Sequence, residues 1–91
     1  MDIFWDKQRR GAHAMFTRWQ ERNPKGYVLN LASKTRAVLH EALCPHIAAF
    51  SSNLEASLTA RPKVCSADQT ALREWVSKTS LELTRCRDCS S

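Results

Sequence analysis

Glycine and proline are scarce in this chain of 91 residues, which has two of the first and three of the second. Such a composition leaves no room for a long low-complexity linker. No hydrophobic run approaches the roughly 20 residues that a membrane span needs. The first ten residues, MDIFWDKQRR, lack the apolar core of a signal peptide. The sequence therefore predicts one small cytoplasmic domain covering residues 1–91.

Cysteine, by contrast, is well represented, with four residues in the chain. A chain of this length buries only about 60–65% of its unfolded surface, so disulfides or a structural metal often supplement its thin core. Because cytoplasmic thiols stay reduced, four cysteines in this setting indicate a metal site before they indicate disulfides.

The pattern of apolar and turn residues predicts an α+β fold, with an N-terminal helix, a short antiparallel sheet and a second helix. Asp6 is expected to cap the first helix, which ends near Arg22 at the turn residues NPKG, so residues 1–22 form the helical start. Its expected apolar side comprises Trp5, Ala12, Met15, Phe16 and Trp19. The expected strands are YVLNL, RAVLH, PKVC and LELT, which are residues 27–31, 36–40, 62–65 and 81–84.

A capping box is expected to open the second helix, because Ser66 is followed three residues later by Gln69. This helix is predicted to run from about Ala67 to Lys78 and to bury Leu72, Trp75, Val76 and Thr79.

Two pairs of possible zinc ligands flank the central part of the chain. Cys86 and Cys89 form a C-x2-C pair, a spacing that lets two thiolates from one turn reach one ion. His40 and Cys44 form an H-x3-C pair where a strand is expected to end. Together they predict one structural Zn²⁺ in a tetrahedral site with three cysteines and one histidine. Three thiolates and one Zn²⁺ give this site a net charge of about −1, which Arg85 and Arg87 can offset.

Cys65 and His46 are alternative ligands. Cys65 ends a predicted strand, where a small buried side chain is the commoner role of a cysteine. His46 lies two residues after Cys44 and can replace His40 if the chain turns the other way.

The segments YVLN…VLH-EAL-CPHI and TRCRDC resemble the zinc-binding domain of the Ada DNA-repair protein and of related modules attached to nucleases. The resemblance covers residues 27–89 and implies a zinc-binding core there. The chain is also similar to small prokaryotic proteins of uncharacterised function. In Ada the first ligand is a cysteine that accepts a methyl group from a DNA phosphate. His40 stands at that position, so we expect no methyl-transfer repair. Four protein ligands leave no open position on the zinc, so we expect no other enzymatic activity.

Charge supplies the last functional hint, because the formal net charge is +5 and the isoelectric point is about 9.4. A basic surface beside a zinc fold suits contact with phosphates, and Arg9, Arg10, Lys34 and Arg36 are the expected contacts. The sequence thus favours a nucleic-acid-binding accessory of a DNA-processing or DNA-defence system. The alternative is a protein-interaction module, such as a phage-type inhibitor that docks on a partner enzyme through the first helix.

Overall fold

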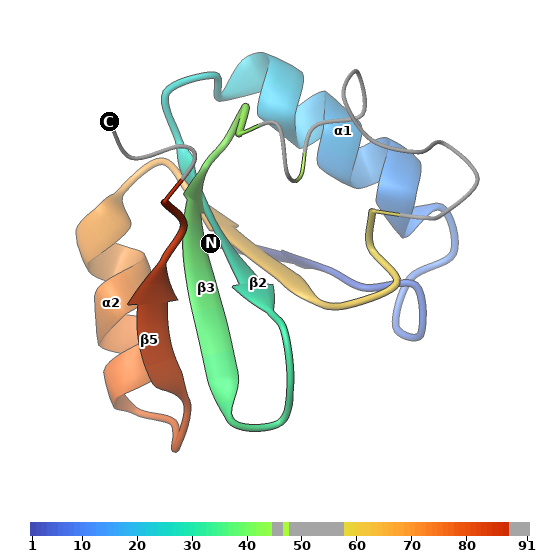
Figure 1. The fold of residues 1–91 in the computed structure, drawn as a ribbon. Helices are drawn as coiled ribbons and strands as arrows, with labels where there is room; N and C mark the ends of the chain where they lie inside the picture. Colours follow the sequence, from blue (N-terminus) through green and yellow to red (C-terminus); the bar gives the residue numbers. More distant parts are fainter. Residues whose placement is uncertain (45–46, 48–57, 88–91) are drawn as a thin grey trace.

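The computed structural model describes residues 1–44, 47 and 58–87, which form two helices and a mixed sheet of five strands (Figure 1). This confirms the α+β class. In the described residues, neither helix has the length and apolar character needed to cross a lipid bilayer. The elements in chain order are β1 (Asp2–Phe4), α1 (Ala12–Arg22), β2 (Tyr27–Leu31), β3 (Arg36–Glu41), β4 (Lys63–Ser66), α2 (Gln69–Ser77) and β5 (Glu82–Arg85).

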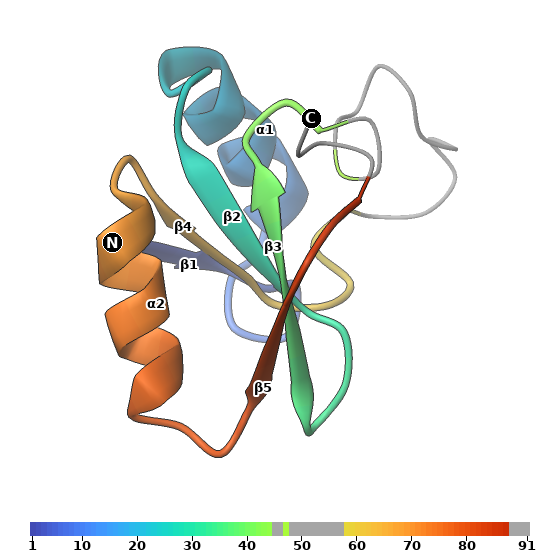
Figure 2. The ribbon, with the colours of Figure 1, turned by 60° about the vertical axis from the view of Figure 1, so that its left-hand side comes forward.

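The strands lie in the order β1-β4-β2-β3-β5, and the sheet is not purely antiparallel as expected, because β5 pairs with β3 in parallel. The other neighbours pair antiparallel, so β4 and β5 run in the same direction. A helix is the usual connection between such strands, and α2 provides it. Figures 1 and 2 both show β5 beside β3 at one edge of the sheet.

Each helix covers a different face of the sheet, because side chains alternate between the two faces along a strand. On one face, Phe16 of α1 packs in a cluster with Val28 and Cys65. On the other, Leu72 and Val76 of α2 pack in a second cluster with Leu29, Leu39 and Val64. The two clusters give the domain two thin cores, one per face. The polar site residues described below belong to the α1 side.

The N-terminal segment differs from the predicted helix. Residues 2–4 form β1, which pairs with β4, and α1 begins only at Ala12, after Gly11 in the left-handed conformation with φ 75°. Asp6 does not cap this helix, because its backbone N–H donates to the Thr59 carbonyl and its carboxylate accepts from the Thr59 hydroxyl. A three-residue strand carries no readable pattern, and it forms because the edge of β4 satisfies its backbone groups.

The buried face of α1 repeats every four residues, at Ala12, Phe16 and Gln20. Ala12 and Phe16 were expected there, but Met15 is 39% exposed and Trp5 lies outside the helix. The polar Gln20, only 3% exposed, takes the next place on the stripe.

The helix α2 begins two residues later than predicted. Its N-cap is Asp68, whose carboxylate accepts from the Thr70 backbone N–H at 2.9 Å. Ser66 cannot take the cap position because it is still part of β4, paired with Tyr27 of β2. Leu72 and Val76 are buried as expected, Trp75 is half-buried, and Thr79 lies past the end of the helix and is exposed.

Candidate metal centre

His40 lies near the end of β3 and points toward the face covered by α1. It stands opposite Val28, and Val28 stands opposite Cys65 on its other side, so the three side chains share one face of the sheet. The His40 side chain is 5% exposed. A buried polar ring of this kind needs a hydrogen-bond partner or a metal to offset its loss of water.

The parallel pairing of β5 brings Cys86 beside His40. Arg85 stands opposite Leu39, and the Cys86 N–H donates to the Leu39 carbonyl at 2.9 Å. His40 follows Leu39 and Cys86 follows Arg85, so the two potential ligands lie side by side. Without the α2 crossover, Cys86 would not meet His40 and Cys44.

Cys44 reaches the same place through a tight turn directly after β3. The Ala42 N–H donates to the Gly26 carbonyl at 2.9 Å, and the Cys44 N–H donates to the Glu41 carbonyl at 3.0 Å. The chain therefore reverses at the end of the sheet and returns the Cys44 thiol over it, where the residue is only 2% exposed.

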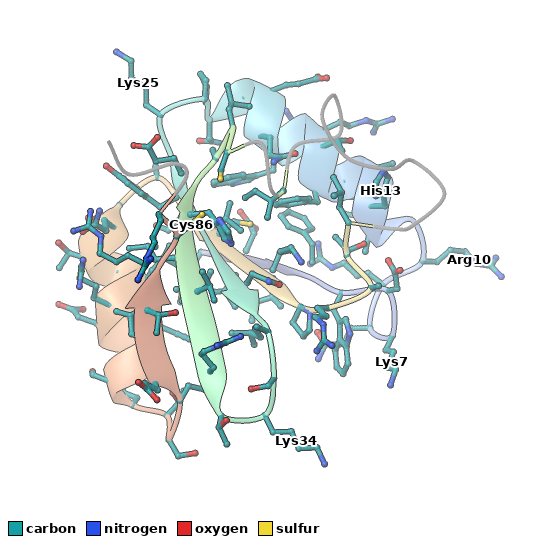
Figure 3. The ribbon with its side chains drawn as sticks, viewed as in Figure 1. Lys7, Arg10, His13, Lys25, Lys34 and Cys86 are labelled. Atoms are coloured by element: carbon teal, nitrogen blue, oxygen red, sulfur yellow. The ribbon has the colours of Figure 1, made fainter. Side chains whose placement is uncertain are left out.

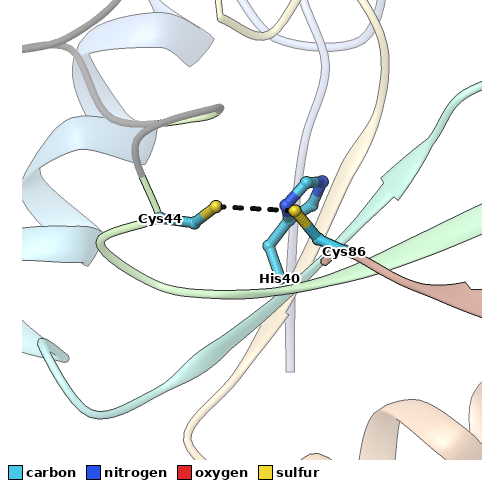
Figure 4. Close-up of side chains that lie close together, drawn as sticks. All are labelled: His40, Cys44 and Cys86. Atoms are coloured by element: carbon cyan, nitrogen blue, oxygen red, sulfur yellow. Dashed lines mark hydrogen bonds between the residues drawn. The ribbon is translucent and has the colours of Figure 1, made fainter. Parts of the chain in front are cut away.

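The three side chains converge, as Figure 4 shows. Their ligand atoms lie within 4.8 Å of one another, close enough to hold a metal ion. The Cys44 and Cys86 Sγ atoms are 3.8 Å apart, in the contact that the dashed line marks as a thiol–thiol hydrogen bond. With Zn–S bonds of about 2.3 Å, two ligands of a tetrahedral site lie about 3.8 Å apart. A disulfide would instead need about 2.05 Å.

Gln20 is the site residue that sequence analysis missed. Its side-chain Nε2 donates to the Ala42 carbonyl at 2.7 Å and to the Ile47 carbonyl at 3.1 Å, on either side of Cys44. One amide thereby ties the cysteine turn to α1. The sequence did carry a signal, because Gln20 lies four positions after Phe16, on the buried stripe of the helix. A polar side chain at such a position indicates a buried hydrogen bond.

Replacing Gln20 by Met keeps the side-chain volume but leaves both carbonyls without this donor. An unsatisfied buried polar group costs about 1–3 kcal/mol, so we expect the free energy of unfolding to fall by that amount. Metal should also be lost more readily to a competing chelator, because the Cys44 turn is less restrained. Urea unfolding and chelator competition measure the two effects. The exposed Gln8→Met serves as the control and should change stability by less than about 0.5 kcal/mol.

The other candidate ligands fall into two groups. Cys65 is fully buried but lies outside the cluster of ligand atoms, as expected for a small core side chain. It is two strands from His40, and neighbouring strands are about 4.8 Å apart, which is too far for a shared ion. Burial raises the pKa of the Cys65 thiol well above its ordinary value, with Asp2 adding to the shift, so it stays protonated. Cys89 and His46 lie outside the described residues.

Lys63 is a second unusual buried group on the α1 side of the sheet, only 5% exposed. Its Nζ donates to the Asn30 Oδ1 at 2.8 Å and to the Arg61 carbonyl at 3.4 Å. Burial lowers the pKa of Lys63 from 10.5 to about 8, with Cys65 and Asp6 opposing the shift and Arg61 adding to it. The ammonium is thus easier to deprotonate in the folded chain than in the unfolded one.

Stability should consequently rise between about pH 8 and pH 9. In that range the unfolded chain still holds the Lys63 proton that the folded chain has released, and the effect is at most about 1.4 kcal/mol per pH unit. Above about pH 9 the raised pKa of Cys65 acts in the opposite sense, because the unfolded chain then loses a thiol proton that the folded chain keeps. Urea unfolding of the metal-loaded protein from pH 7.5 upward measures the rise. The ligand thiols also contribute to the rise, because the metal-loaded chain holds them deprotonated. Lys63→Met should remove the Lys63 share of the rise, and an unchanged rise in that variant would refute the assignment.

The four predicted nucleic-acid contacts are all exposed, and Arg9, Lys34 and Arg36 line three different hollows. Arg9 and Arg10 lie in the loop before α1, not on the helix, and the Arg9 guanidinium sits 5.7 Å from the centre of the Phe4 ring. Lys34 lies in the β2–β3 hairpin turn, away from Arg10 in Figure 3. Arg36 begins β3 and, with Arg87, lines a hollow that reaches His40 and Cys86.

Comparison of the chain with protein-family models, with curated proteins and with solved structures found no match. The resemblance to the Ada domain therefore has no support beyond the residues that suggested it. The geometry of His40, Cys44 and Cys86 is the firmest functional observation.

Proposed function

We propose that the chain is a non-enzymatic module that holds one structural Zn²⁺ through His40, Cys44, Cys86 and Cys89. The observation that carries the proposal is the convergence of one imidazole and two thiols within 4.8 Å, each under 10% exposed. Nitrogen and sulfur donors are the set that zinc prefers in closed sites. Cys89 completes the tetrahedron by its C-x2-C spacing from Cys86.

Native mass spectrometry tests this directly. The purified chain should carry one zinc ion, which a strong chelator removes. A chain that folds with no metal after expression in zinc-supplied medium would overturn the proposal.

The proposed role of the zinc is structural because four protein ligands leave no open position for a substrate or an activated water. His40 replaces the methyl-accepting cysteine of the Ada domain, so the module lacks that chemistry. The remaining feature that can support a function is the positive charge of its surface. We therefore assign it to nucleic-acid binding, as an accessory of a DNA-processing or DNA-defence system. Binding should weaken steeply with salt, because each neutralised phosphate releases condensed counterions.

Docking on a partner protein through α1 is the second candidate. It is favoured by the 39% exposure of Met15, beside the half-buried Trp19, where both line a hollow with Arg18 and Arg22. A partner that co-purifies with the chain at high salt, and is lost on Met15→Glu, would favour this role over nucleic-acid binding.

A further inference from the structure

A groove of about 530 Å³ lies away from the candidate metal centre, between four segments that are distant in sequence. One wall is the segment after β1, with Trp5 and Lys7, and the opposite wall is the β2–β3 hairpin. The segments before β4 and β5 close the groove. Its lining residues are Trp5, Lys7, Leu31, Ser33, Lys34, Ala60, Arg61, Pro62 and Leu81.

The charge of this groove has one sign. Lys7, Lys34 and Arg61 contribute three cations, and no aspartate or glutamate is among the lining residues. Lys7 and Lys34 extend from the same end of the molecule in Figure 3, although they belong to different elements. The Arg61 Nη1 donates to the Ala32 carbonyl at 2.6 Å, which fixes its guanidinium against the hairpin. The groove therefore presents a positively charged rim suited to an anionic chain.

The floor of the groove is apolar and contains an aromatic ring. Trp5, Leu31, Pro62 and Leu81 are each half-buried, so part of each side chain meets solvent. The Lys7 Nζ lies 5.7 Å from the centre of the Trp5 ring. Because Lys7 lies over the ring, a stacked base would take its place on the indole face, and the displaced cation could then contact the neighbouring phosphate.

We infer that this groove binds single-stranded nucleic acid, with a base stacked on Trp5 and phosphates on Lys7, Lys34 and Arg61. The inference rests on the proposed nucleic-acid-binding role and specifies its surface and its strand class. A duplex would use the cations alone, because its bases are already stacked on one another. A single strand can use the ring as well as the rim, and it does so with little regard to sequence.

Fluorescence anisotropy with a labelled oligothymidylate of roughly 12 nucleotides, titrated at several salt concentrations, tests the inference. Trp5→Ala should weaken binding by about 5- to 150-fold, and Trp5→Phe should retain most of the affinity. The double change of Lys7 and Lys34 to Gln should weaken binding and reduce the log–log salt slope by about 0.7 per lost phosphate contact.

The matched control is the double change of Lys25 and Lys78 to Gln, which removes the same charge from exposed positions outside the groove. It should leave the affinity within about twofold of wild type, and zinc content and circular dichroism should be unchanged in every variant used. Equal losses from the two lysine pairs, or equally tight binding to a duplex or to polyglutamate, would overturn the groove assignment alone. Absence of oligonucleotide binding at low salt would overturn the nucleic-acid role as well.

Discussion

A strong chelator is expected to unfold most of the domain, with loss of its circular dichroism signal and recovery when zinc is restored. Structural zinc sites contribute about 10 kcal/mol or more of apparent binding energy, which is comparable to the whole stability of a small domain. Cys44 and Cys86 belong to the same packed cluster as Phe16 and Val28, so losing the ion disrupts the core under α1. Thermal unfolding followed with and without chelator measures the effect.

The core on the other face supplies an internal control for that experiment. Leu29, Leu72 and Val76 pack together without any of the three site residues. We therefore expect near-ultraviolet signals from Trp19, beside the first core, to change at least as early as those from Trp75, beside the second. A melting temperature that chelator leaves unchanged would contradict a structural role for the metal.

Single substitutions of the ligands are expected to separate the four cysteines into two classes. His40→Ala, Cys44→Ser, Cys86→Ser and Cys89→Ser should each lose the zinc and largely unfold the chain, because removing one ligand opens the site and leaves the others buried without charge compensation. Cys65→Ala should keep the zinc and cost only about 1–2 kcal/mol, the loss of a small buried side chain.

Mass spectrometry of the zinc content and urea unfolding of each variant distinguish the two classes. Cys65 is the matched control because it is a cysteine on the same face of the sheet, as deeply buried as His40, Cys44 and Cys86. The assignment would be wrong if Cys65→Ala lost the metal while His40→Ala kept it. Retention by Cys89→Ser alone would instead leave a site with three protein ligands and one open position.

Local patterns were sufficient for the central hairpin and for the third strand. YVLNL and RAVLH are short, mostly apolar runs between turn signals, and both lie where they were expected, as does the strand that ends near Cys65. Three of the four predicted ligands, His40, Cys44 and Cys86, come together in the structure, and the H-x3-C and C-x2-C spacings that predicted them are set by the reach of one turn. The start of the chain was misread, since its helical periodicity began before Gly11, where the backbone turns.

The sequence by itself determined the α+β class, the hairpin, the second helix and the residue types of a candidate metal site, because each depends on neighbours within a few positions. Tertiary structure decided which of these elements and residues come into contact. Residues 2–4 became a strand because β4 offered a free edge. Cys86 came to lie beside His40 because α2 returns β5 in parallel to β3. Gln20 secures the turn of Cys44 from another element. Such contacts join residues far apart in the chain, and their energies appear only once both cores are packed.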